Sequence, residues 1–205
     1  MSSVRTATRV TVAVVAARSF LILHGLGASG PGHWQTWLGA RLRADGERIA
    51  YPDLPDADLP SLPAWRDALD GELAALPAGE VVVVCHSLAC LLYLHHVADG
   101  GAPANRVLLA APPSEASGVA EIQGFFPVPL PALGAGARRV CSDNDPSCPE
   151  GAAGLYGEPL GIPVDLLPGG GHLNPEAGYG PWPAVERWCL GDDGPITEHH
   201  DHQPL

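Results

Sequence analysis

Four consecutive valines, Val81-Val82-Val83-Val84, run directly into the turn sequence Cys85-His86-Ser87-Leu88-Ala89-Cys90. Apolar residues at successive rather than alternating positions are typical of a strand covered on both faces, as in a parallel sheet. A helical stretch is expected from residue 88 to residue 98. A single serine, Ser87, therefore lies at the junction of a buried strand and a helix.

Short β-branched runs and helical patterns alternate along the rest of the chain. Strands are expected at residues 10–15, 20–23, 81–84, 106–110, 139–141 and 164–167. Helices are expected at residues 34–44, 63–76, 88–98 and 184–190, where apolar side chains recur at helical spacing. This alternation predicts a three-layer α/β fold with a mostly parallel sheet and helices on both faces. Functional loops of such sheets gather at the carboxyl ends of the strands.

Length and charge limit the classes of function. The 205 residues fit one domain, expected at residues 1–190, followed by an acidic tail at 191–205 that is expected to be disordered. The formal net charge is −12, and the 11 basic residues are scattered. Nucleic acids and anionic membranes both require a basic patch, so neither is an expected partner.

Cysteine usage and hydropathy bear on the compartment. The five cysteines form an odd set without a Cys-x-x-Cys pair, which favours buried free thiols in a reducing, cytoplasmic compartment over disulfides or zinc. The apolar start of the chain is interpreted as two strands rather than a leader, and no apolar run reaches the roughly 20 residues that span a bilayer. His199, His200 and His202 are not expected to form a functional metal site, and no cofactor is expected.

Three residues in the order Ser, Asp, His carry the candidate chemistry. Ser87 needs a base to become a nucleophile, and a histidine, His172, follows the strand expected at 164–167 in a loop with three glycines. Asp143 and Asp145 both follow the strand expected at 139–141, and either is a candidate for orienting the histidine. This chain order is that of α/β-hydrolases among the convergent serine triads.

Backbone amides complete the hypothesis of acyl transfer. The strand expected at 20–23 ends in His24-Gly25-Leu26-Gly27, a turn that can direct the Leu26 N–H into the site. Leu88, directly after the serine, supplies the second N–H. Two such donors would stabilise an oxyanion, which is usually the largest catalytic contribution.

The chain resembles the small single-domain serine hydrolases that include retinoblastoma-binding protein 9 and many bacterial relatives. Matching pieces run from about residue 21 to residue 188 and include Leu54-Pro55-Asp56, Trp65, His86-Ser87-Leu88-Ala89-Cys90 and residues 142–149. The two longest are His24-Gly25-Leu26-Gly27-Ala28-Ser29-Gly30-Pro31-Gly32-His33-Trp34-Gln35 and Gly171-His172-Leu173-Asn174-Pro175-Glu176-Ala177-Gly178-Tyr179-Gly180-Pro181-Trp182-Pro183. Cys85 and Ala89 depart from the usual glycines on either side of the serine.

The resemblance implies an α/β-hydrolase fold and hydrolysis of a small carboxyl ester or amide. It favours Asp145 as the acid, because the family's aspartate directly precedes a proline, here Pro146, and it leaves Asp143 as the fallback. The alternatives are a binding or scaffold protein with an unused triad, and acyl transfer to an acceptor other than water.

The substrate pocket is less defined by the sequence than the triad. The segment 112–136 is too rich in proline to form a large helical lid, which suggests an open site for small acyl groups. His33 and Trp34, beyond the oxyanion turn, are candidate pocket residues, or they simply begin a helix. Phe125 and Phe126, in the proline-rich segment, are also candidates, but packing under a loop is the favoured alternative for them.

Overall fold

The computed structural model describes residues 17–196 of the 205-residue chain. The strand expected at 10–15 and the histidines at 199, 200 and 202 lie outside the described residues.

The centre of the fold is one six-stranded sheet in the order β2-β1-β3-β4-β5-β6, with every neighbouring pair parallel. Its strands are β1 (Arg18–Leu23), β2 (Arg48–Ala50), β3 (Glu80–His86), β4 (Arg106–Ala110), β5 (Ala137–Ser142) and β6 (Val164–Leu167). All carboxyl ends therefore meet at one edge. The strand reversal lies between β1 and β3, where the chain returns after β2, and β3 leads directly to Ser87.

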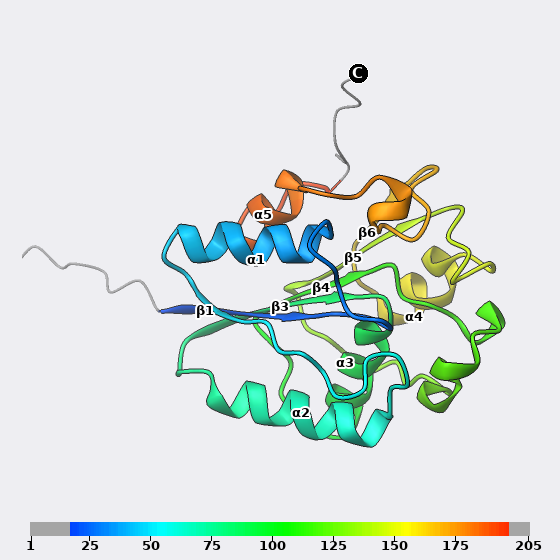
Figure 1. Cartoon of the computed structure of the whole chain (residues 1–205), viewed down its shortest axis with the longest axis horizontal. Coiled ribbons are helices and arrows are strands. Elements are labelled where there is room, and N and C mark those ends of the chain that lie inside the picture. Colours follow the sequence, from blue (N-terminus) through cyan, green and yellow to red (C-terminus); the bar gives the residue numbers. More distant parts are fainter. Residues whose placement is uncertain (1–16, 197–205) are drawn as a thin grey trace, which may run out of the picture.

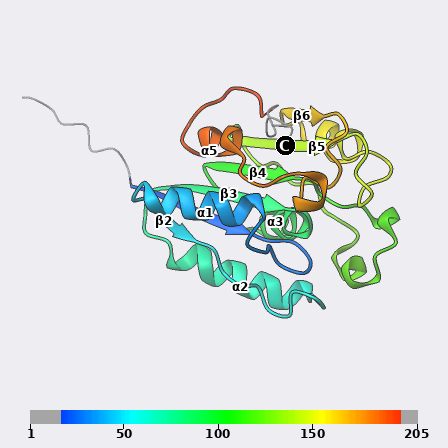
Figure 2. The ribbon, with the colours of Figure 1, turned by 45° about the horizontal axis from the view of Figure 1, so that its top comes forward.

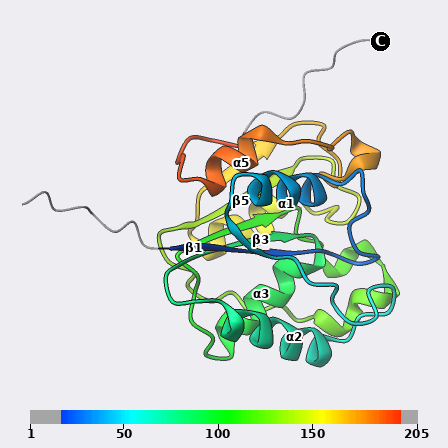
Figure 3. The same ribbon diagram turned by 60° about the vertical axis from the view of Figure 1, so that its left-hand side comes forward.

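Helices cover both faces of the sheet, as Figures 1 and 3 show. On one face lie α1 (Trp34–Ala44) and α5 (Pro183–Cys189), side by side in Figure 2, and on the other lie α2 (Leu62–Ala75) and α3 (Leu88–Ala98). Successive residues of β1 serve opposite cores: Phe20 packs on the α1 side and Leu21 on the α3 side. The predicted three-layer α/β-hydrolase fold is confirmed.

Short helical turns complete the described chain. They are η1 (Glu115–Ser117), η2 (Ala120–Phe125), η3 (Ala153–Gly157), α4 (Glu158–Leu160) and η4 (Pro175–Ala177). Both η1 and η2 lie in the proline-rich segment 112–136. In the described structure, this segment contains no helix longer than η2. No large lid domain covers the sheet there.

Two features differ from the sequence expectation. The edge strand β2 was not expected, because three residues are too short a run to give a strand pattern. The first part of the expected tail, 191–196, packs on the domain: Ile196 is fully buried and its N–H donates to Asp165 Oδ2 at 2.8 Å. Asp193 pairs with Arg106 Nη1, also at 2.8 Å.

Candidate active site

Ser87 lies in a strained turn between β3 and α3. Its φ of 56° and ψ of −124° are rarely adopted by residues with a side chain, and such strain concentrates at functional sites. Its N–H donates to the carbonyl of Ala110 on the neighbouring strand at 2.8 Å, which fixes the turn to the sheet. Cys85 and Ala89, two residues before and after the serine, are fully buried, so this turn accommodates a thiol and a methyl group in place of two glycines.

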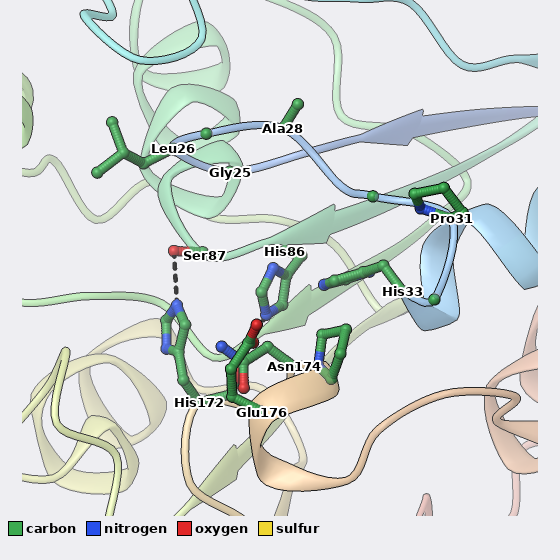
Figure 4. Close-up of a pocket in the computed structure, with 14 residues that line it drawn as sticks. Gly25, Leu26, Ala28, Pro31, His33, His86, Ser87, His172, Asn174 and Glu176 are labelled. Atoms are coloured by element: carbon green, nitrogen blue, oxygen red, sulfur yellow. Dashed lines mark hydrogen bonds between the residues drawn. The ribbon is translucent and has the colours of Figure 1, made fainter.

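His172 joins Ser87 to a carboxylate. Its Nε2 lies 2.9 Å from Ser87 Oγ, and its Nδ1 lies 2.9 Å from each carboxylate oxygen of Asp145 (Figure 4 shows the serine contact). Asp145 is 4% exposed and also accepts a hydrogen bond from the Ser147 N–H at 2.8 Å. With Nδ1 donating to the carboxylate, Nε2 is left to accept the serine proton.

The two aspartates of the loop after β5 have different partners. Asp143 is exposed, and its Oδ1 accepts from the N–H of Gly169 at 2.7 Å. Asn144 Oδ1 accepts from the N–H of Gly171, also at 2.7 Å. These two contacts hold the glycine loop that carries His172, while the contact with the imidazole itself belongs to Asp145.

Two buried side chains hold the backbone around His172 from the α1 side. Trp34 Nε1 donates to the carbonyl of Leu173 at 2.9 Å, and His86 Nε2 donates to the carbonyl of His172 at 3.0 Å. Leu173 has a φ of 49°, a conformation that costs free energy and needs such support.

A cavity of about 400 Å³ opens in front of Ser87. Its walls are the loops after β1 and after β6, and its lining residues are Gly25, Leu26, Gly27, Ala28, Gly30, Pro31, Gly32, His33, His86, Ser87, His172, Asn174, Pro175 and Glu176. His33 Nδ1 accepts from the N–H of Gln35 at 3.1 Å, which caps α1 and leaves Nε2 as the donor. Burial, and secondarily repulsion from His172, lowers the pKa of His33 to about 4.

The sequence of this chain matches the model of one known protein family. The profile described as serine hydrolase matches residues 20–189, which include the strand, turn and loops just described. The chain belongs to the serine hydrolase family.

Relatives of this serine hydrolase agree with the fold. YdeN of Bacillus subtilis (strain 168), which is named a hydrolase, is 37% identical over 79 residues; the match covers 37% of this chain and 41% of YdeN, less than half the length of either. The crystal structure of YdeN has a TM-score of 0.69 at 22% identity, covering 83% of this chain and 95% of that one. The structure of a YdeN-like hydrolase from Pectobacterium atrosepticum has a TM-score of 0.70 at 21% identity, and the match covers 84% of this chain and 91% of that one. The structure of Est1E of Butyrivibrio proteoclasticus has a TM-score of 0.62 at 13% identity, and the match covers 87% of this chain and 89% of Est1E.

The structure separates the four expected pocket residues. His33 lines the cavity, but Trp34 is fully buried beneath it. Phe125 is also fully buried and packs edge-on against Trp65, with ring centroids 5.5 Å apart, while Phe126 is half-buried against the same core. Neither phenylalanine lines this cavity, because the turn η2 directs both into the α2–α3 core, which agrees with the favoured alternative of packing and not with the pocket role.

Both walls of the cavity have lining residues that were not expected from the sequence. Pro31 and Gly32 precede His33, and Asn174, Pro175 and Glu176 follow His172. All five lie within the two longest stretches shared with the resembling family, so that resemblance was the available signal.

The two residues expected to be oxyanion donors, Leu26 and Leu88, lie in the loop after β1 and directly after Ser87. Leu26 lines the cavity, and within residues 17–196 its N–H has no backbone hydrogen-bond acceptor. Leu88 is the first residue of α3, where a helical N–H has no partner within the helix. Neither N–H has a backbone acceptor within residues 17–196, so both remain candidates for binding an oxyanion.

Three negative findings apply to the described part of the chain alone. No group of three or more histidine, cysteine or acidic residues could hold a metal ion. No helix there is long and apolar enough to cross a membrane. All five cysteines, which fall within the described residues, are buried and unpaired.

Proposed function

We propose that this serine hydrolase cleaves a small carboxyl ester or amide through an acyl-enzyme on Ser87. The observation that carries the proposal is the hydrogen-bonded series of Ser87, His172 and Asp145, with both imidazole nitrogens 2.9 Å from their partners. A binding protein would need none of these three groups in this order.

In the first half of the reaction, Ser87 Oγ attacks the substrate carbonyl carbon while His172 Nε2 removes the hydroxyl proton. The carbonyl oxygen becomes an oxyanion, which the N–H groups of Leu26 and Leu88 stabilise. Asp145 holds the Nδ1–H and stabilises the imidazolium. The imidazolium then gives its proton to the departing alkoxide or amine, and the acyl group remains on Ser87.

In the second half, water replaces the leaving group. His172 removes a proton from the water, and the resulting hydroxide attacks the acyl carbon. The same two amides stabilise the second oxyanion. When it collapses, the Ser87 alkoxide departs and recovers the proton from His172, and a carboxylic acid is released.

A fluorophosphonate probe tests this proposal directly. We expect intact-mass analysis to show one adduct on the wild-type protein and none on Ser87→Ala. Ser117→Ala, which removes a hydroxyl outside the cavity, should label like the wild type. No adduct on folded wild-type protein would reject the serine-hydrolase mechanism and favour the scaffold alternative.

Product analysis distinguishes hydrolysis from acyl transfer. The open cavity leaves room for water, so we expect the free acid as the main product when an alcohol or amine is added at millimolar concentration. A dominant transfer product would instead assign an acyltransferase to the same triad.

Two finer proposals accompany this one. The five buried, unpaired cysteines support a reducing, cytoplasmic compartment. The motifs that begin at His24 and at Gly171 support a place among the small hydrolases that resemble retinoblastoma-binding protein 9.

A further inference from the structure

Glu176 supplies the one carboxylate among the residues that line the cavity, and no arginine of the described chain lines it. The Glu176 side chain is exposed, and within residues 17–196 it has no hydrogen bond or ion pair. In Figure 4, Glu176 lies with Asn174 on the side of the cavity that carries His172. An unpaired negative charge thus borders the reacting groups.

The neighbouring imidazoles do not oppose a positive charge. Burial lowers the pKa of His33 to about 4, and burial likewise holds the pKa of His86 well below its ordinary value. Both rings are therefore neutral near pH 7. They present hydrogen-bonding and aromatic surface to the cavity without adding charge of the same sign as a cation.

Four arginines of the sheet lie far from Glu176, and three of them, Arg18, Arg106 and Arg138, are paired with acids. Arg18, Arg48 and Arg106 are the first residues of their strands, and Arg138 is the second residue of β5, so these arginines lie at the amino edge of the sheet. The cavity lies at the carboxyl edge. A second exposed acid, Asp58, lies there close to the loop after β1, which forms one wall of the cavity. Its Oδ1 is 3.8 Å from the position of a β-carbon built on Gly27.

In the proposed reaction the leaving group lies beside His172, which is on the same loop after β6 as Glu176. In the proposed reaction His172 gives its proton to the departing atom, so that part of the substrate lies beside the loop that carries both residues. The acyl carbon, in contrast, is held at Ser87 and the two amides. We therefore expect Glu176 to attract a charge on the leaving group more than a charge on the acyl part.

We propose that the natural substrate carries a positive charge on its alcohol or amine portion, and that Glu176 is the residue that selects it. This inference rests on the proposed function, because it uses the acyl-transfer geometry at Ser87. Exposed ion pairs are weak, so the expected preference is about two- to fivefold.

Matched esters test the selection. Acetylcholine and 3,3-dimethylbutyl acetate have the same shape and differ in one positive charge. We expect kcat/KM for acetylcholine to exceed that for the neutral ester in the wild type, and the ratio to approach one in Glu176→Gln. Glu47→Gln, which removes the same charge next to the amino end of β2, should keep the wild-type ratio. Added salt should lower the ratio because the pair is exposed.

A second measurement needs no turnover of these esters. Choline and 3,3-dimethylbutanol are compared as protectors of Ser87 against the fluorophosphonate, and choline should protect at about two- to fivefold lower concentration in the wild type but not in Glu176→Gln. Equal protection in the wild type, or a preference that survives in Glu176→Gln, would overturn the inference while the labelling itself still supported the serine mechanism. Absence of any labelling would reject the proposed function, and the inference with it.

Discussion

Gly25 and Ser87 touch so closely that no side chain fits between them. A β-carbon built on Gly25 would lie 2.7 Å from Ser87 Cβ and 3.2 Å from Ser87 Oγ. Real β-carbons do not approach other heavy atoms to 2.7 Å, so a larger residue at position 25 would have to displace the serine turn or the loop after β1. The contact joins the loop of the Leu26 amide to the nucleophile.

We expect Gly25→Ala to reduce kcat/KM about 10²-fold, the effect of displacing reacting groups by roughly 1 Å. Overpacking should lower the free energy of unfolding by about 1–3 kcal/mol. Ester hydrolysis and urea unfolding measure the two effects. Gly124→Ala is the control, since a β-carbon there meets nothing within 4 Å. Wild-type activity in Gly25→Ala would show that the turn is not held by this contact.

The two aspartates after β5 should differ sharply in their effect on turnover. Asp145→Asn replaces the carboxylate that accepts the hydrogen bond from His172 Nδ1–H by a neutral amide and should lower kcat about 10⁴-fold. Asp143→Asn keeps an oxygen for the Gly169 N–H and should change kcat less than about tenfold. Steady-state hydrolysis of an activated ester compares them. Similar losses in both variants would mean that the loop geometry matters more than the charge.

The stability of the domain should fall in mild acid. The pKa of His33 is lowered from 6.5 to about 4, so the unfolded chain binds a proton below about pH 6.5 that the native protein binds only near pH 4. Stability is therefore complete above pH 6.5 and is lost as the pH falls. The loss is about 1.4 kcal/mol per pH unit for this group, or about 2 kcal/mol between pH 6.5 and pH 5.

Urea unfolding at pH 7 and pH 5 measures the effect. His33→Asn keeps a side-chain acceptor that can cap α1 but removes the titrating group, so its stability should depend less on pH. The buried His86 remains and contributes a loss in the same direction. An identical pH dependence in His33→Asn and the wild type would contradict the assignment to His33.

The interior of the sheet was predictable because its residues are apolar on both faces. The helices expected at 34–44 and 88–98 and the strands expected at 106–110 and 164–167 have those bounds in the structure. The edge strand β2 was missed because it has only three residues, none of them fully buried. Its position depends on pairing with β1, which no local pattern records.

The three candidate catalytic residues could be predicted from their order in the chain and their positions in loops. The residues that line the cavity wall could not be predicted in this way. Whether Asp143 or Asp145 meets His172 depends on the path of a loop, and the residues alone left that choice open. Phe125 resembled a pocket residue because large apolar side chains often line acyl sites. Its burial against Trp65 follows from the turn η2, which the prolines concealed.

The segment after α5 has a practical consequence for shortened versions of the protein. Trimming at residue 190, just beyond the family match, would remove the partner of Arg106 in Asp193 and the buried Ile196. Arg106 stacks 4.5 Å from the centre of the Trp188 ring, and Arg138 and Asp165 both contact the same segment. A truncation placed at the end of the family match would therefore expose to solvent the core residues that the segment 191–196 covers. A shortened version should therefore keep residues 191–196.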